Sequence, residues 1–264
     1  MNTLSCLAHI KRTDNQRPPP PPLLADIEML IDRSGSMWTM TKETEDGTQE
    51  FVNSQKEMAN KTGIQTHIRI QTFDDKVETM TGFDGGDITH TPDIDINSLY
   101  PRGTTRLIDT ACESLYEQER RYHNYRKKLP NMVKQLNPTI VRIFALITDG
   151  EDNESTLFTS SNLNKLIKKN KQQGVTCMFL AANQDAIHQG DIFGFDSGHS
   201  LTYSSQGENA TNALRAVSQQ IARTCSGNSS TQFNELQRTR SAPPLNKDYQ
   251  HKPQIYRNNP LCRC

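Results

Sequence analysis

The chain has 264 residues, its 30 basic and 30 acidic side chains give a formal charge of zero, and 33% of its residues are hydrophobic. This length allows one large domain or two small ones, and the low hydrophobic fraction indicates a core diluted by polar segments. No apolar run approaches the roughly 18 residues that a membrane helix needs, so we expect no membrane association.

Residues 1–24 are expected to form a disordered, proline-rich arm. Pro18 to Pro22 form an unbroken proline run, which favours an extended polyproline II segment. This run suits either a stiff spacer or a ligand for an SH3 or WW domain. The apolar patch from Leu4 to Ile10 is short and lacks the basic start of a signal peptide. We therefore expect an intracellular, cytoplasmic protein whose cysteines are reduced.

Strand-like and helix-like runs alternate over residues 25–226, the range expected for the folded domain. Strands are expected at short apolar or β-branched runs, and helices where apolar residues recur at helical spacing. The expected elements are a strand over 25–31, a helix over 40–61, a hairpin over 64–83, a helix over 107–122, an insertion over 122–138, a strand over 139–148, a helix over 163–173, a strand over 175–181 and a helix over 209–224.

The alternation of strands and helices predicts an α/β fold. The segment from Thr139 to Thr148 (TIVRIFALIT) is almost wholly apolar, which is typical of a central strand covered on both faces. The expected architecture is a doubly wound, Rossmann-like, mainly parallel sheet with helices on both faces and one antiparallel edge hairpin. Ligands of such folds bind beyond the carboxyl ends of the strands.

Residues 227–264 are expected to form a disordered basic tail, because they contain six basic side chains against two acidic ones and little periodic hydrophobicity. The body of the domain is correspondingly acidic. This charge distribution argues against nucleic acid as a direct ligand of the body. Arg120–Arg121 and Arg126–Lys128 form a basic patch, which is either a solvated helix end or a contact for an acidic partner.

Short polar side chains gather in three segments beside the expected strand ends. These segments are Asp32–Ser36 after the first strand, Gly103–Thr105 before a helix, and Thr148–Gly150 after the central strand. Each contains a glycine that allows a tight turn. Hydroxyl and carboxylate oxygens suit a hard cation such as Mg²⁺. The predicted oxygen donors are Asp32, Ser34, Ser36, Thr105 and Asp149.

The three segments resemble the metal-ion-dependent adhesion site of the von Willebrand factor A (vWA) family. The segment from Asp32 to Ser36 contains the DxSxS motif of that site. The segment from Arg102 to Asp109 is similar to the family's GGTxLxDA segment, with Thr105 in the place of the metal-site threonine. Thr104 stands where the family commonly has a second glycine. A TDG segment supplies Asp149 in the place of the second aspartate, and the resemblance covers about residues 25–225.

This resemblance implies a Mg²⁺ site, with Mn²⁺ or Ca²⁺ as alternative cations. In this family the serines and threonine contact the cation or its waters, the aspartates act largely through water, and a partner's Glu or Asp often completes the coordination. We therefore expect metal-dependent binding of a protein partner that presents an acidic side chain. The residues expected at the rim of the site are Arg33, Thr104, Arg106, Glu151 and Asn183.

The segment from Phe179 to Asp185 also resembles a strand-end sequence of intracellular, microbial-type members of the family, and a viral source would fit as well. Asn183 in this segment either shapes the site or forms a plain turn.

Two other functions compete with metal-dependent binding. A scaffold protein could carry the same residues with an idle metal site and recruit partners through its proline run and tail. A Mg²⁺-dependent hydrolase of the haloacid-dehalogenase type would need a general-acid aspartate two residues after Asp32, where this chain has Ser34. A serine hydrolase would need a nucleophile elbow of the G-x-S-x-G type, and the chain has none. We therefore do not expect an enzyme.

Overall fold

The computed structural model describes residues 22–183, 185–228 and 231–242. Six strands form one sheet in the order β3-β2-β1-β4-β5-β6, in which only the β2–β3 pair is antiparallel. The strands are β1 (Leu24–Asp32), β2 (Gln65–Phe73), β3 (Val77–Asp87), β4 (Ile140–Thr148), β5 (Val175–Ala182) and β6 (Ser200–Tyr203). This topology confirms the predicted doubly wound α/β fold with an antiparallel edge hairpin.

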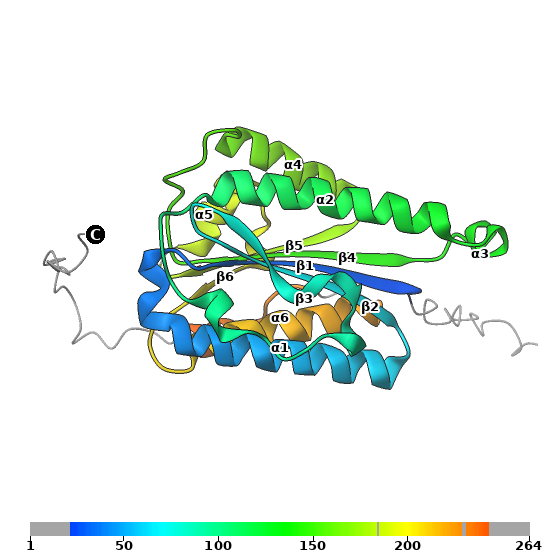
Figure 1. Ribbon diagram of the computed structural model, residues 1–264, viewed down its shortest axis with the longest axis horizontal. Helices are drawn as coiled ribbons and strands as arrows, with labels where there is room; N and C mark the ends of the chain where they lie inside the picture. The colour runs from blue at the N-terminus through cyan, green and yellow to red at the C-terminus, as the bar shows by residue number, and fades with distance from the viewer. Residues whose placement is uncertain (1–21, 184, 229–230, 243–264) are drawn as a thin grey trace, which may run out of the picture.

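Helices cover both faces of the sheet (Figure 1). Helices α1 and α6 pack on one face, and α2, α4 and α5 pack on the other. The helices are α1 (Thr41–Thr62), α2 (Leu107–Lys128), α3 (Asn131–Gln135), α4 (Ser160–Gln172), α5 (Ala186–Phe193), α6 (Asn209–Cys225) and α7 (Glu235–Ser241). Short 3₁₀ turns occupy Gly35–Met40, Ile88–His90, Ile96–Leu99 and Ser197–His199. No helix in the described ranges combines the length and the apolar character needed to cross a membrane.

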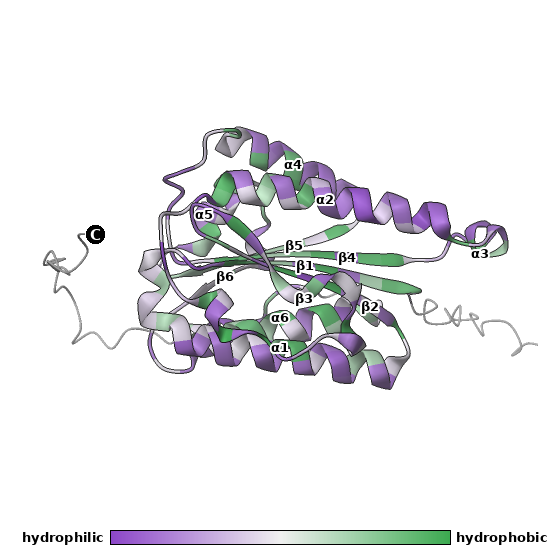
Figure 2. Ribbon diagram, viewed as in Figure 1, coloured by the Kyte–Doolittle hydropathy of each residue, from purple (hydrophilic) through white to green (hydrophobic). Residues whose placement is uncertain are grey.

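The two central strands, β1 and β4, are buried because their residues are largely apolar. All nine residues of β1 are buried, and the last seven of β4 are buried as well. Because both faces are covered, a continuous apolar run replaces the alternation of a half-exposed strand. Figure 2 shows the hydrophobic residues concentrated in the strands and on the inward sides of the helices. Among the described residues, Cys112, Cys177 and Cys225 are buried free thiols.

The segment after α6 differs from the expected tail. Within the described range 231–242, Phe233 is buried, and α7 packs with its Gln237 buried. The guanidinium of Arg238 donates to the carbonyl oxygens of Ser200 and Ser197, at 2.8 Å each, which ties α7 to β6. Sequence periodicity missed this helix because it is short and contributes few apolar side chains. Residues 1–21 of the expected arm, and residues 243–264 of the expected tail, lie outside the described residues.

The expected insertion over 122–138 is a continuation of regular structure. Helix α2 runs on to Lys128, and α3 follows from Asn131 to Gln135 before β4 begins. These residues are polar because this end of α2 projects beyond the sheet, as Figure 1 shows.

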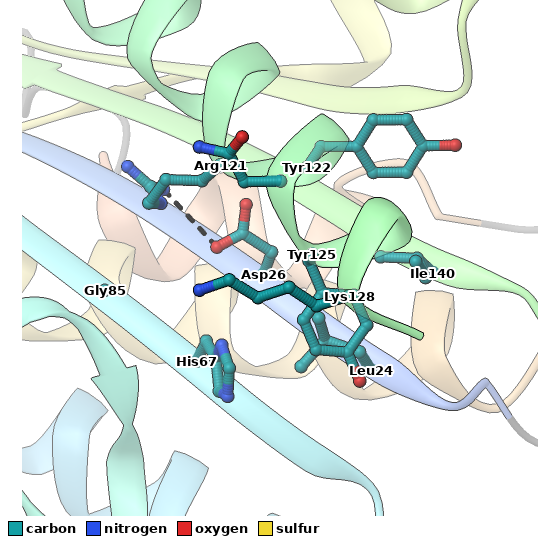
Figure 3. Close-up of a pocket in the computed structure, with 10 residues that line it drawn as sticks. Leu24, Asp26, His67, Gly85, Arg121, Tyr122, Tyr125, Lys128 and Ile140 are labelled. Atoms are coloured by element: carbon teal, nitrogen blue, oxygen red, sulfur yellow. Dashed lines mark hydrogen bonds and ion pairs between the residues drawn. The ribbon is translucent and has the colours of Figure 1, made fainter. Parts of the chain in front are cut away.

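A buried ion cluster lies between the sheet and the second half of α2. The Nη2 of Arg121 donates to Oε2 of Glu28 at 2.7 Å and to Oδ1 of Asp26 at 3.3 Å. Gly85 has φ of +97°, and a Cβ there would lie 3.1 Å from Cδ of Arg121, so a glycine leaves room for this arginine. Figure 3 shows the Arg121–Asp26 pair at the wall of a cavity of about 260 Å³, which Lys128 also lines.

Burial raises the pKa of both acidic members of this cluster, Asp26 and Glu28. Glu28 is fully buried, and desolvation raises its pKa from 4.5 to about 7 in spite of the nearby Arg121 and Arg69. Between these two pH values the folded chain keeps a proton that the unfolded chain has released. The free energy of unfolding should therefore fall as pH rises through this window.

We expect Glu28→Gln to remove this pH dependence. Relative to the wild type, the variant should gain up to about 3 kcal/mol of stability between pH 5 and pH 8. Urea denaturation at the two pH values measures the difference. Glu57→Gln, which replaces an exposed acid on α1, is the matched control and should leave the slope unchanged. Equal slopes for the wild type and Glu28→Gln would contradict a raised pKa at Glu28.

Candidate functional site

Asp32 is the buried centre of the predicted site. It ends β1, and only 1% of its surface is exposed. Its Oδ1 accepts from the backbone amide of Ser34 at 2.7 Å, and its Oδ2 accepts from the hydroxyl of Thr148 at 2.5 Å. Desolvation raises the pKa of Asp32 to about 6, although both hydrogen bonds favour the ionised form. Neither of these two partners carries a positive charge.

The two serines and the second aspartate form a chain of short contacts beside Asp32. The hydroxyl oxygens of Ser34 and Ser36 lie 3.1 Å apart. The hydroxyl of Ser36 donates to Oδ1 of Asp149 at 2.7 Å, although 113 residues separate them in the sequence. Burial raises the pKa of Asp149, and the Ser36 hydrogen bond opposes the rise. The structure thus brings together the donors expected from the first and third segments.

The second segment meets the other two beside Gly150. A Cβ on Gly150 would lie 3.3 Å from the hydroxyl oxygen of Thr105, 3.5 Å from that of Ser36 and 3.8 Å from Oδ2 of Asp32. The oxygens of all three segments therefore converge on the space beside one glycine. Thr105 is 3% exposed and faces this space, whereas Thr104 is exposed to solvent. Thr105 is thus the member of the threonine pair that adjoins this space.

The loop after β4 holds Thr105 and the start of α2 in place. The amide of Thr105 donates to the side chain of Asn153 at 2.8 Å, and the amide of Ile108 donates to Asp152 at 3.1 Å. In return, the buried carboxylate of Asp109 accepts from the amides of residues 156–158, at 2.8 to 3.1 Å. Burial would raise the pKa of Asp109, but these amides and Arg106 hold it below its usual value. The acidic loop is therefore partly a structural cap rather than only a solvated rim.

Arg33 does not lie at the rim where the sequence suggested it. It is 2% exposed, its Nε donates to Oδ2 of Asp74 at 3.2 Å, and its Nη1 donates to the carbonyl oxygen of Ser98 at 3.2 Å. Arg102 also donates to Oδ2 of Asp74, at 2.7 Å, and both arginines pair with Glu78. Arg33 therefore anchors the loop before α2 to the turn after β2. Sequence reasoning missed Asp74 because only the fold brings this turn beside the DxSxS loop.

The other residues expected at the rim differ in their exposure and in their contacts. Arg106 pairs with Asp109, Nε to Oδ2 at 3.2 Å, and with Glu113 at 2.8 Å. Glu151 is exposed. Asn183 has φ of 53°, and its side chain accepts from the amide of Ser205 at 3.0 Å, which makes it part of the turn between β5 and α5. Thr104, Glu151 and Asn183 are therefore the exposed residues of this set, whereas Arg33 is buried and Arg106 is half-buried.

An exposed aromatic pair, which the sequence analysis did not single out, follows the first segment. Trp38 is 61% exposed and Tyr100 is 57% exposed, and their ring centroids lie 5.4 Å apart in an edge-to-face arrangement. Trp38 stands two residues after Ser36, so this pair lies beside the converging oxygens. Large aromatic side chains left in solvent next to a polar site are typical of surfaces that bind another protein.

The donor set fits a hard cation that is held mainly by neutral oxygens. In residues 22–183, 185–228 and 231–242, no three His, Cys, Asp or Glu side chains are grouped so that they could hold a metal. The site instead offers two carboxylates and three hydroxyls, a combination that suits Mg²⁺ with several retained waters. The space that a Cβ on Gly150 would fill lies where these oxygens meet. Asp32, Ser34, Ser36, Thr105 and Asp149 are the residues that could hold the cation.

Comparison with known proteins gives structural matches alone. No protein-family model matches the chain, and no curated protein matches it. Proximal thread matrix protein 1 from the mussel byssus matches with 14% identity and a TM-score of 0.48, over 78% of this chain and 46% of that one. The vWF domain of the type V pili tip protein Mfa5 from Porphyromonas gingivalis matches with 12% identity and a TM-score of 0.49, over 77% and 97%.

The SpRpn10 VWA domain matches with 16% identity and a TM-score of 0.44, over 72% of this chain and 94% of that one. This chain spans less than half the length of the mussel protein. The fold assignment rests on the strand order and the helix layers of this chain itself.

We expect Gly150→Ala to weaken cation binding without unfolding the domain. The added methyl group would crowd the oxygens of Thr105, Ser36 and Asp32, at 3.3 to 3.8 Å, and would exclude an ion or its water. Calorimetric titration with Mg²⁺ measures the affinity, and circular dichroism checks the fold. Gly86→Ala on β3, where the Cβ would lie 3.5 Å from Asp84, is the control. An unchanged Mg²⁺ affinity in Gly150→Ala would show that cations bind elsewhere.

Proposed function

We propose that this chain is a vWA-type protein-binding module that uses a divalent cation to hold an acidic side chain of its partner. The observation that carries the proposal is the convergence of oxygens from three distant segments beside Gly150. Asp32 and Asp149 supply negative charge, and Ser34, Ser36 and Thr105 supply neutral oxygens. Because hydroxyls neutralise less of the ion's charge than carboxylates would, the bound cation stays electrophilic and favours one further anionic oxygen.

The partner is proposed to be a protein for two reasons. The exposed Trp38–Tyr100 pair beside the site offers the kind of aromatic contact that dominates protein interfaces. Glu151 on the rim disfavours ligands that carry much negative charge beyond the one carboxylate. Mg²⁺ is the proposed cation, with Mn²⁺ and Ca²⁺ as alternatives. The free buried thiols of Cys112, Cys177 and Cys225 favour an intracellular location.

Hydrolysis of a phosphoester is less well supported than binding. A haloacid-dehalogenase mechanism needs a free nucleophilic aspartate and an acid two residues later. Both carboxylate oxygens of Asp32 accept hydrogen bonds, and Ser34 stands in the position of the acid. We therefore propose binding rather than catalysis.

We expect saturating Mg²⁺ to raise the melting temperature of the full chain, and EDTA to reverse the rise. At a hundred times its dissociation constant, a cation that binds only the folded state adds about 2.7 kcal/mol. Thr105→Val and Asp149→Asn should each abolish the shift, because they remove an oxygen or a charge with little change in volume. Glu154→Gln, an exposed change in the same loop, is the control. The absence of any shift in the wild type would favour an idle scaffold.

We further expect the chain to bind an immobilised peptide that carries a single glutamate in Mg²⁺ and to release it in EDTA. A peptide of equal length with glutamine in place of that glutamate should not be retained, because it offers no carboxylate for the cation. Thr105→Val should lose retention, whereas Glu154→Gln should keep it. Equal retention of both peptides, or retention in EDTA, contradicts a metal-held carboxylate. Turnover of a phosphoester that depended on Asp32 would overturn the ranking of binding above hydrolysis.

A further inference from the structure

The end of α2 and the short helix α3 form a projecting surface that the proposed function does not use. We call the residues from Arg126 to Leu136 the basic tip. Figure 1 shows this tip extending beyond the sheet, at the end of the molecule away from the 3₁₀ turn Gly35–Met40 and thus from the metal site. Helix α2 has 22 residues, about 33 Å at 1.5 Å per residue, so it separates the two ends.

Charge is strongly segregated at the tip. From Glu119 to Asp149 the sequence contains no other acidic residue, although it contains seven basic ones, in a chain whose overall charge is zero. Arg120 and Arg121, which precede the tip, are neutralised by Glu117 and by the buried Glu28. The four basic residues of the tip have no ion-pair partner among the described residues: Arg126, Lys127, Lys128 and Lys134. This concentration of uncompensated positive charge predicts an anionic ligand.

Apolar side chains stand at the apex of the same surface. Met132 is 80% exposed and Leu136 is 81% exposed, the highest values among the large hydrophobic side chains of the described residues. The loop around α3 is held in shape, because Nζ of Lys134 donates to the carbonyl oxygen of Lys127 at 2.9 Å and Arg126 donates to the side chain of Asn137 at 3.1 Å. The two apolar side chains are therefore presented outward by an ordered turn, with the basic groups around them.

We propose that the basic tip docks on an anionic membrane surface, where Met132 and Leu136 enter the headgroup layer and the four cations contact acidic lipids. Clusters of four or more basic residues next to apolar side chains suit such a surface. A nucleic acid would match the charge but would leave both apolar side chains without a use. The tip projects rather than forming a groove, which suits a flat, yielding surface. The sequence led us to expect no membrane association, because no apolar run is long enough to span a membrane. Peripheral docking, however, needs no spanning helix.

Docking through the basic tip would fix the orientation of the molecule relative to the membrane. The tip lies at the amino-terminal edge of the parallel strands, beside Leu24 and Ile140, where Figure 3 shows Lys128 and Tyr125 of α2. The converging oxygens lie at the opposite, carboxyl-terminal edge. A molecule docked through the tip would therefore present its metal site away from the membrane.

The test is flotation of the full chain with two kinds of vesicle at moderate salt. One kind is phosphatidylcholine alone, and the other contains about 30 mol% phosphatidylserine as the anionic lipid. We expect binding only to the anionic vesicles. Lys127→Gln/Lys128→Gln should weaken it about 25-fold, since each basic residue near such a surface contributes about fivefold. Lys165→Gln/Lys168→Gln on α4, with the same charge change on exposed residues, is the control and should retain binding. Met132→Ser/Leu136→Ser should weaken binding while leaving the melting temperature unchanged.

A fluorescent variant reports on the apolar contact. In Leu136→Trp the emission should shift to the blue on anionic vesicles, whereas Trp38 of the 3₁₀ turn Gly35–Met40, the single tryptophan of the wild type, should not respond. Equal loss of binding in the α4 control and the tip variant overturns the proposal. So does the absence of a blue shift, or binding to duplex DNA that depends on the tip while vesicles are not bound.

Discussion

The parallel pairing of β1 with β4 is the constraint on which the site depends. Their register sets Ile31 opposite Ile147, so Asp32 and Thr148 leave the sheet side by side. The hydroxyl of Thr148 then donates to Asp32 at 2.5 Å, and the next two residues, Asp149 and Gly150, turn over the end of β1. A shift of one residue in this register would exchange the faces of both strands and separate the donors.

Helix α2 extends this constraint across the molecule. Its first turn is bound to the loop after β4 through Asp109, Asp152 and Asn153, so the position of Thr105 depends on the same strand end. In its second half, Arg121 donates to the buried Glu28 of β1, and its last turn projects beyond the sheet. One helix therefore connects the proposed metal site to the proposed membrane-docking tip, which gives a partner held at the first a defined orientation relative to the second.

The sequence predicted the long elements well and the short ones poorly. The apolar run of β4 and the periodic helices α1, α4 and α6 carry enough repeated signal to be recognised within a few residues at each end. Helix α2 was recognised at its start, but it continues to Lys128, past the expected end at Tyr122. Strand β6 has four residues, and α5 and α7 have eight and seven, too few for a period to show. The sequence predicts Arg33 at the rim of the site, but the structure buries it. Its burial depends on Asp74 and Glu78, which no local pattern connects to it.

The sequence by itself determined the fold class, because apolar runs and their alternation with helical patterns are local properties of the chain. It also predicted five oxygen donors at one sheet edge. Only the tertiary structure decided that Thr105 is buried while Thr104 is exposed, and that the oxygens of Thr105, Ser36 and Asp32 lie beside Gly150. It alone also separated the neutralised Arg120 and Arg121 from the uncompensated cations of the tip. These outcomes depend on contacts between residues 40 to more than 110 positions apart, such as the one between Ser36 and Asp149, and a chain specifies such contacts only through the packing of its strands and helices.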